Sequence, residues 1–287
     1  MVKSLVLENI SVGFKLPQGV FYAVDDVSLN LHGGNFTAII GESGCGKSVL
    51  GQAILNILPS GVVKKGRVLY NGEQVKKILS AFGIIPQNPS ESLNPVRKIG
   101  KQMQDILAVH NITDGDNSYK KQCLRLFGLQ EAERVLAAYP HELSGGMLQR
   151  VLCAMAVSSK PEWILADEPT KGLDEQVGAV VRKNLLTIKQ DLRLSMLIIT
   201  HDIALAQEVC DDVLVMYAGQ VLEHNADIWH KPLHPYTKGF LQALPKNGLQ
   251  VIPGKAPVPG ESFTGCKFAA RCPYCTTRCK EEMPAMQ

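Results

Sequence analysis

The feature that most constrains the fold is a glycine-rich stretch between an apolar run and a helical pattern. Phe36 to Ile40 has the composition of a buried strand, and Lys47 to Leu58, which is followed by Pro59, has that of a helix. The stretch between them fits G-x-x-x-x-G-K-[ST], in which glycines allow a tight turn whose backbone N–H groups face inward. A strand, such a turn and a helix N-terminus together predict a site for phosphate oxygens.

The residues of this predicted phosphate loop have separate roles. Lys47 is expected to reach the β and γ phosphates, and Ser48 to place its hydroxyl on Mg²⁺. The predicted nucleotide-binding residues of the loop are Gly41, Glu42, Ser43, Gly44, Cys45, Gly46, Lys47, Ser48 and Val49. The loop alone indicates a P-loop NTPase and leaves kinases, GTPases and recombinases open.

A second apolar run, which begins at Trp163, ends in two acidic residues, Asp167 and Glu168. Strand ends in such sheets point at the ligand crevice. We expect Asp167 to hold Mg²⁺, directly or through water, and Glu168 to orient or deprotonate the attacking water. Two acids at a strand end would by themselves indicate a solvated surface. Their apolar lead-in and their place downstream of the phosphate loop favour the catalytic interpretation.

Strands alternate with helices along most of the chain, which predicts an α/β fold with a mostly parallel sheet. With 287 residues, 45% of them hydrophobic, the chain is long enough for one large domain, residues 1–245, and a tail, 246–287, rich in Pro, Gly and Cys. No apolar run is long enough to span a bilayer, so we expect a cytoplasmic protein. The net charge of +3 gives no reason to expect nucleic acid as a partner.

A third motif narrows the class of protein. Leu143, Ser144, Gly145 and Gly146 are followed by Gln149-Arg150. A serine N-cap with glycines before a helix would be the ordinary interpretation. The stretch resembles the signature motif of ABC ATPases. In that family the signature of one subunit closes over the nucleotide held by the phosphate loop of another.

Other positions match further motifs of that family. Gln87 resembles the loop glutamine that contacts Mg²⁺ and faces the membrane subunits. Asp174, in Gly172-Leu-Asp, resembles the loop that links two ATPase subunits, and His201 resembles the switch histidine that contacts the γ-phosphate. Phe14 resembles the aromatic residue on which adenine stacks, and Tyr22 competes with it for this role.

The resemblance covers residues 1 to about 245 and implies the ABC ATPase fold. This fold has a mostly parallel core sheet, an antiparallel β subdomain and a helical subdomain, here at about residues 88–158, to which the chain adds the Cys-rich tail. The implied ligands are ATP and Mg²⁺. Two ATPase subunits would hold two ATP molecules head to tail, with Glu168 and His201 carrying out hydrolysis.

Two segments resemble one branch of the family, the oligopeptide, dipeptide and nickel importers. These are the loop Gln87 to Pro95 and the stretch His234-Pro-Tyr-Thr-Lys238, which leads to Pro245. The branch implies a second, different ATPase subunit, two membrane permeases and an extracytoplasmic substrate-binding protein. The chain would then sit at the cytoplasmic face of the cell membrane. Peptides are the preferred substrate, with nickel as the alternative.

Four cysteines crowd the tail: Cys266, Cys272, Cys275 and Cys279. Four thiolates suit a [4Fe–4S] cluster or tetrahedral Zn²⁺. The spacing differs from a zinc ribbon and is closer to the compact runs that hold iron–sulfur clusters, which some members of the branch carry. Free or disulfide-linked thiols remain the other alternative.

Two rival functions come from other classes. A non-transport ABC ATPase that acts on ribosomes or DNA would carry two such domains or a long coiled coil. A DNA-repair ATPase with zinc modules would be far longer. Neither matches this chain, and copurification with permeases, ribosomes or DNA would separate the three.

Overall fold

The computed structural model describes residues 4–17, 19–74, 81–244, 247–258, 261 and 263–284. The chain divides into two compact units. The first, here called the helical unit, consists of residues 32–36 and 81–209. The second, the phosphate-loop unit, consists of residues 4–31, 37–74 and the described residues from 210 onward. Pro245 of the His-Pro-Tyr segment lies outside the described residues.

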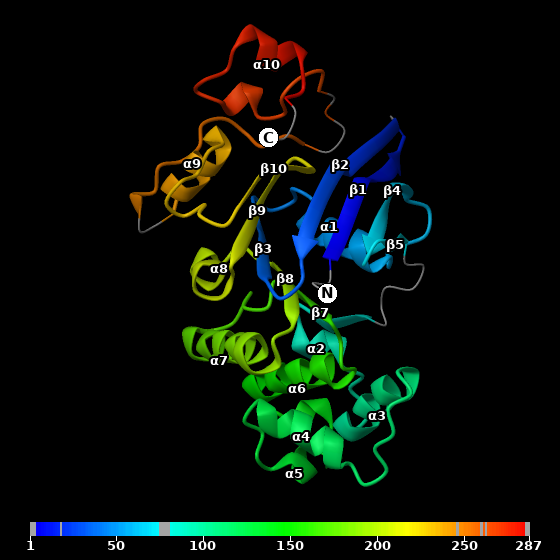
Figure 1. Cartoon of the computed structure of the whole chain (residues 1–287). Coiled ribbons are helices and arrows are strands. Elements are labelled where there is room, and N and C mark those ends of the chain that lie inside the picture. The colour runs from blue at the N-terminus through cyan, green and yellow to red at the C-terminus, as the bar shows by residue number, and fades with distance from the viewer. Residues whose placement is uncertain are drawn as a thin grey trace. The chain divides into compact units, whose positions relative to one another are not determined.

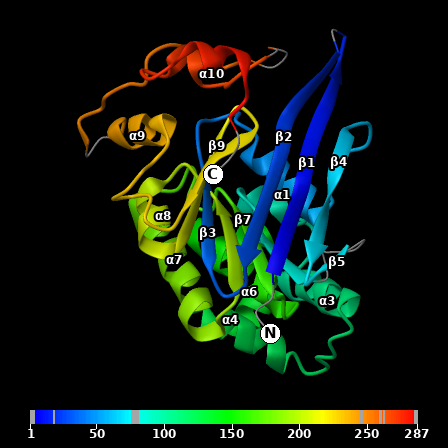
Figure 2. The ribbon, with the colours of Figure 1, turned by 45° about the horizontal axis from the view of Figure 1, so that its top comes forward.

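The phosphate-loop unit contains an antiparallel sheet with the strand order β2-β1-β4-β5. Figure 2 shows two long strands side by side, β1 (Ser4–Leu16) and β2 (Gly19–His32), followed by β4 (Val63–Tyr70) and β5 (Glu73–Gln74). The register of β1 on β4 shifts between Glu8 and Ser11. The short apolar runs Leu5 to Leu7 and Val20 to Val24 are parts of these two long strands, which belong to the antiparallel subdomain of the predicted fold.

A second set of strands in this unit carries the phosphate loop. Strand β3 (Phe36–Ile40) runs parallel to β9 (Asp212–Tyr217), and β10 (Gln220–Asn225) returns antiparallel to β9. The turn between β9 and β10 has positive φ at Ala218 (47°) and Gly219 (83°), which is the geometry of a tight hairpin. The loop after β3 enters α1 (Lys47–Leu55).

The end of α1 differs from the prediction. The helix stops at Leu55 and not at Leu58, because Asn56 adopts a left-handed conformation with φ 56°. The N–H of Ile57 then donates to the carbonyl of Gln52 at 3.0 Å, which satisfies a free carbonyl at the helix end. Asparagine is one of the few residues that favours this conformation, so the cap, and not Pro59, ends the helix.

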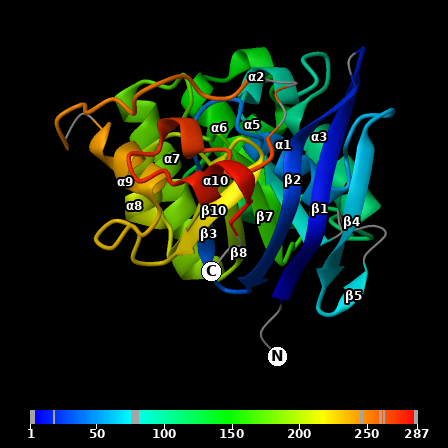
Figure 3. The same cartoon turned by 90° about the horizontal axis from the view of Figure 1, so that it is seen from above.

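The structure describes three short elements in the C-terminal segment of the phosphate-loop unit, within the residues given above. They are α9 (Pro235–Gln242), a 3₁₀ turn η5 (Ala269–Arg271) and α10 (Thr277–Glu281). In Figure 3 the C-terminal segment lies over the β9–β10 hairpin as seen from above, and Lys267 Nζ of this segment donates to the carbonyl of Ala218 in that hairpin at 2.9 Å. The segment thus packs on the strand that neighbours β3.

The helical unit is built on three parallel strands in the order β8-β7-β6. They are β6 (Phe82–Ile85), β7 (Trp163–Asp167) and β8 (Ser195–Ile199). Trp163 aligns with Phe82 on one side and with Ser195 on the other. Nearly every residue of these strands is buried, as expected for a parallel sheet covered on both faces.

Helices and the loops between them make up the rest of this unit (Figure 1). The segment 89–158 contains α2 (Pro89–Ser92), α3 (Ile99–Val109), α4 (Ser118–Leu126), α5 (Ala132–Ala137), η2 (Pro140–Glu142) and α6 (Gly145–Ser158). Next come α7 (Glu175–Thr187), η3 (Ile188–Leu192) and α8 (Ile203–Val209). Ile99, Met103 and Leu107 of α3 are fully buried, and Ile106 is half-buried. Among the described residues, no helix combines the length and apolar character needed to cross a membrane.

Candidate active site

The phosphate loop lies so close to its neighbours that two glycines cannot be replaced. A Cβ at Gly41 would lie 2.1 Å from the carbonyl oxygen of Met216, and one at Gly46 would lie 2.1 Å from that of Ala23. Both residues also have positive φ, 149° and 105°. Close approach and backbone conformation therefore both demand glycine at these positions, as the motif predicts.

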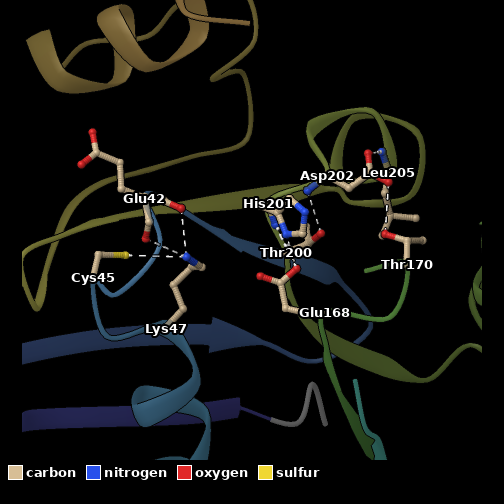
Figure 4. Close-up of polar contacts among 10 residues, drawn as sticks. Glu42, Cys45, Lys47, Glu168, Thr170, Thr200, His201, Asp202 and Leu205 are labelled. Atoms are coloured by element: carbon tan, nitrogen blue, oxygen red, sulfur yellow. Dashed lines mark hydrogen bonds and ion pairs between the residues drawn. The ribbon is translucent and has the colours of Figure 1, made fainter. Parts of the chain in front are cut away.

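Lys47 is held inside the loop, and its side chain is almost fully buried. Figure 4 shows its ammonium group facing the loop, where it donates to the carbonyl oxygens of Gly41 at 2.9 Å and Glu42 at 3.0 Å. The sulfur of Cys45 lies 3.8 Å away. Burial raises the pKa of the Cys45 thiol, although Lys47 acts in the opposite direction. The loop therefore presents one positive charge among backbone donors.

The remaining loop residues differ in exposure. Ser43 and Gly44 are exposed at the tip of the loop. Ser48 and Val49 are half-buried in the first turn of α1. A pocket of about 400 Å³ adjoins the tip, because Gly44 is among its lining residues.

Of the two aromatic residues predicted to stack on adenine, one lines this pocket and the other does not. Tyr22 lines the pocket, together with Phe263 of the C-terminal segment, whereas Phe14 is a half-buried residue of β1 that does not line it. The ammonium of Lys65 lies 5.1 Å from the centre of the Tyr22 ring. The geometry thus favours Tyr22, the competing residue, as the aromatic neighbour of the loop.

In the helical unit, Glu168 and His201 form a pair. Oε2 of Glu168 lies 2.6 Å from Nδ1 of His201 and accepts the backbone N–H of the same histidine at 3.3 Å. The carboxylate is mostly buried, while 53% of the His201 side chain is exposed. Figure 4 shows the two side chains pointing toward each other. The two residues that the sequence predicts as catalytic are therefore brought together.

The backbone conformation of Glu168 directs its side chain toward His201. Its φ is 48°, a left-handed value that is uncommon outside glycine and often marks a functional residue. Its N–H donates to the carbonyl of Ile199 at the end of β8, at 2.8 Å. The N–H of Lys171 closes the turn onto the carbonyl of Glu168 at 3.1 Å. The conformation is thus held from both sides, which pre-organises the carboxylate.

The segment around His201 is also fixed. Asp202 accepts the N–H of Leu205 at 2.9 Å, which caps the start of α8, and accepts the hydroxyl of Thr170 at 3.1 Å. The N–H of Asp202 donates to the hydroxyl of Thr200 at 2.9 Å. The turn after Glu168 and the turn after β8 are therefore linked by side chains. The motifs did not indicate Thr170 and Asp202.

The signature residues begin α6. The Ser144 hydroxyl accepts the N–H of Met147 at 3.3 Å, so it caps the helix. Ser144 and Gly145 are exposed, and a Cβ at Gly145 would meet nothing within 4 Å, so the start of this helix is accessible. Leu143 is buried. Gln149 is fully buried, and its amide donates to the carbonyl of Pro169 at 3.4 Å, so it joins α6 to the turn after Glu168.

Three further predicted residues occupy the ends of strands and helices. Gln87 is exposed directly after β6, and Asp167 is the half-buried last residue of β7. Asp174 caps α7 by accepting the N–H of Val177 at 2.8 Å. Carboxylate and amide oxygens at strand ends suit Mg²⁺, which prefers oxygen ligands.

The four clustered cysteines share one small fold but do not form a ready ligand set. The N–H of Cys266 donates to the carbonyl of Cys279 at 2.8 Å, and that of Cys275 to the carbonyl of Cys272 at 3.3 Å. Burial raises the pKa of the Cys266 thiol, and the neighbouring Cys279 and Cys272 add to this effect. Within the described part of the chain, no group of three or more His, Cys, Asp or Glu side chains is arranged to hold a metal ion.

The His-Pro-Tyr segment reaches the phosphate loop, which the sequence did not predict. Nδ1 of His234 accepts the N–H of Tyr236 at 3.0 Å and caps α9. Tyr236 is fully buried, and its hydroxyl accepts the backbone N–H of Glu42 at 3.2 Å. Burial pushes the pKa of Glu223 up, but bonds from the N–H groups of Leu233 and His234 outweigh it and leave that pKa below its usual value. The start of the His-Pro-Tyr segment is thus anchored by the charged carboxylate of Glu223, which accepts two backbone N–H groups.

Comparison with known proteins decides the family. A model of the family described as "ABC transporter" matches residues 24–171, and one described as "Oligopeptide/dipeptide transporter, C-terminal region" matches residues 222–279. The chain belongs to the ABC transporter family. It is 37% identical to the dipeptide transport ATP-binding protein DppD of Escherichia coli, over 98% of this chain and 92% of that protein. It is 35% identical to the oligopeptide transport ATP-binding protein OppD of Haemophilus influenzae, over 96% and 91%.

Solved structures of ABC proteins have the same fold. CbiO1 of Clostridium perfringens, part of the transporter complex cbiONQ, is 27% identical with a TM-score of 0.64 and covers 77% of this chain and 88% of its own. The ATP-binding cassette MJ0796, bound to ADP and phosphate, is 25% identical with a TM-score of 0.64 over 77% and 97%. This ABC chain is therefore an ATP-binding subunit of a transporter, an ATPase whose hydrolysis is coupled to transport.

Proposed function

We propose that this ATPase powers the import of oligopeptides or dipeptides. The observation that carries this proposal is the match of residues 222–279 to the C-terminal region of oligopeptide and dipeptide transporters. The named relatives are a dipeptide transport ATP-binding protein, DppD, and an oligopeptide transport ATP-binding protein, OppD, and both align over nearly the whole chain. A nickel importer of the same branch remains the alternative. The ATPase subunit need not touch the substrate, so the proposal rests on these likenesses.

The proposed nucleotide roles rest on the motifs and are supported by the local geometry of each segment. Lys47 would bind the β and γ phosphates with the N–H groups of the loop, and Tyr22 or Phe14 would stack on adenine. Ser48, Gln87 and Asp167 offer the hydroxyl, amide and carboxylate oxygens that Mg²⁺ prefers. The bound ion would neutralise the developing charge on the phosphates.

The Glu168–His201 pair supports a general-base role for Glu168. The proton of the attacking water would pass to a carboxylate oxygen of Glu168. The 2.6 Å contact with Nδ1 of His201 fixes the orientation of that carboxylate, and the exposed part of the imidazole is free to contact the γ-phosphate. The bonds that the backbone of Glu168 makes with Ile199 and Lys171 support this orientation of the carboxylate.

The open N-terminus of α6 supports a role in a dimer. Leu143 to Gly146 would close over the nucleotide of a partner ATPase, with Asp174 at the contact between subunits. We propose a different ATPase chain as the partner, two permeases, a substrate-binding protein and attachment at the cytoplasmic face of the membrane. A groove of about 470 Å³ in the helical unit, lined by Ile84, Pro86 and Asn94, lies beside the Gln87 loop and would receive a permease segment.

The predicted boundaries, an ATPase domain of residues 1–245 with a helical subdomain at about 88–158 and a tail of 246–287, form part of this proposal. The helices α2 to α6 within residues 89–158 support the helical subdomain.

A transport assay tests the proposed substrate. We expect cells or proteoliposomes that contain this chain with its permeases and binding protein to take up dipeptides or oligopeptides in an ATP-dependent way. Uptake of labelled peptides and of nickel would be measured side by side. Nickel uptake without peptide uptake would contradict the peptide proposal and leave the ATPase assignment intact.

We also propose that the cysteine tail holds a [4Fe–4S] cluster, with Zn²⁺ as the alternative. Four thiols in one short segment, whose ends are joined by the backbone bond between Cys266 and Cys279, are the ligand type that either group uses, although the described side chains are not already arranged around a metal ion. Bound metal would tie together a segment that has little apolar core.

Metal analysis of the purified chain tests the tail. We expect anaerobically purified protein to contain about four iron atoms per chain and to absorb visible light, and a Cys272→Ser variant to lose both. A Cys153→Ser variant, in which the changed thiol is fully buried in the helical unit, is the control and should keep the metal. Zinc at about one per chain would support the alternative, and absence of both metals would contradict the proposal.

A further inference from the structure

The phosphate loop carries a carboxylate where an anion has to bind. Glu42 directly follows Gly41, and its backbone carbonyl is one of the two that hold Lys47. Backbone donors and the positive end of α1 attract phosphate at this loop. An unpaired negative charge in the same loop would repel a triphosphate. At the short distances within one loop, one such charge is expected to weaken binding by about tenfold.

Arg271 of the C-terminal segment neutralises this carboxylate. Its Nη1 lies 3.1 Å from both carboxylate oxygens of Glu42. Only 7% of the Arg271 side chain and 26% of the Glu42 side chain are exposed, so solvent screens this pair less than an exposed one. In Figure 4 the carboxylate of Glu42 points away from the ammonium of Lys47. Arg271 therefore binds the Glu42 carboxylate on the side of the loop that faces away from the Lys47 ammonium.

Other contacts hold the guanidinium in this place. Nε of Arg271 donates to the carbonyl of Pro253 at 3.0 Å, and Nη1 donates to the hydroxyl of Tyr217 at 3.4 Å. The guanidinium carbon lies 5.7 Å from the centre of the Tyr217 ring. Burial acts to lower the pKa of Arg271, but Glu42 and Tyr217 raise it above its ordinary value. The arginine therefore stays charged and is fixed before a nucleotide binds.

The backbone of Glu42 is held by the same region. Its N–H donates to the hydroxyl of Tyr236, whose ring packs against Tyr217 with centroids 4.6 Å apart and against Phe268 with centroids 5.4 Å apart. The backbone N–H and the side-chain carboxylate of Glu42 thus both bond to residues of the C-terminal region. The contact joins residues that are 229 positions apart in the sequence, so the loop is not self-contained.

We propose that Arg271 is a positioning residue for the phosphate loop. By pairing with Glu42 it removes a repulsive charge from the loop and so sets the affinity of the loop for the phosphates of ATP. The C-terminal region thereby contributes to nucleotide binding without touching the nucleotide. This inference rests on the proposed role of the loop in holding ATP.

To test the proposal, ATP binding and hydrolysis are measured for the full chain that carries Arg271→Gln and compared with the wild type. We expect the Kd for MgATP and the KM of hydrolysis to rise about tenfold, with kcat at saturating ATP within about twofold of the wild type. The loss should be smaller for MgADP, because ADP carries less negative charge. An Arg271→Gln variant that binds MgATP like the wild type would overturn the proposal.

A second substitution separates charge neutralisation from a structural role. In the double variant Arg271→Gln, Glu42→Gln the repulsive charge is gone, and the Kd for MgATP should return to within about threefold of the wild type. If the double variant binds as weakly as Arg271→Gln alone, the arginine acts only through folding and the proposal fails. Glu42→Gln alone keeps Arg271 and should bind MgATP at least as tightly as the wild type. Weaker binding by that variant would also contradict the proposal.

Arg278→Gln is the matched control. Arg278 also pairs with a glutamate, Glu282, at 2.8 Å, but both side chains are exposed, and the pair lies within α10 and its C-cap. Its replacement should leave the Kd for MgATP unchanged. Failure of the wild-type chain to bind MgATP would instead contradict the proposed function, so the two outcomes are distinguishable.

Discussion

Replacement of Glu168 by glutamine should lower ATP turnover by about 10² to 10⁴-fold, the usual contribution of a positioned general base. Glutamine keeps the size of the side chain and an oxygen that can accept the N–H of His201. It removes the carboxylate that would take the proton of the attacking water. Binding of MgATP should survive, because the phosphate contacts come from other residues. Phosphate release and a nucleotide titration of the same preparation would measure both effects.

Glu208→Gln is the control for this substitution. Glu208 lies on α8 in the same unit and pairs with Arg182 at 3.5 Å, with about half of its side chain exposed. An exposed pair of this kind contributes little to stability, so turnover should stay at the wild-type level. Turnover in Glu168→Gln equal to that of the control would refute the general-base role.

The strands and helices that the sequence predicted well have strong local patterns. Phe36–Ile40 and Trp163–Asp167 are short apolar runs that end at a glycine or an acid, and both are strands in the structure. Strand β4, Val63–Tyr70, was not predicted, because Val68 is its only buried residue and the apolar periodicity of a strand is missing. Its place comes from pairing with β1, a contact between distant segments.

Within the site, the motif residues could be predicted and the links between motifs could not. Lys47, Glu168, His201 and Ser144 lie in short patterns whose chemistry is readable from residue type and spacing. The contacts that hold them come from elsewhere, as when the buried amide of Gln149 reaches Pro169. No local pattern marks such a pairing, because it depends on packing between distant segments. The contacts of Glu42 with the C-terminal region are of the same kind.

Replacement of Lys47 by alanine should weaken MgATP binding by roughly a hundredfold or more, the expected effect of losing charge-assisted contacts to two phosphates. The structure places the Lys47 ammonium inside the loop, 2.9 Å from the carbonyl of Gly41. Lys64→Ala is the control, because Lys64 donates to the carbonyl of Ala53 at 3.2 Å near the opposite end of α1. That variant should lose some stability and keep its affinity, since its charge lies at the far end of the helix. Equal affinities of the two variants for MgATP would show that Lys47 does not bind the phosphates.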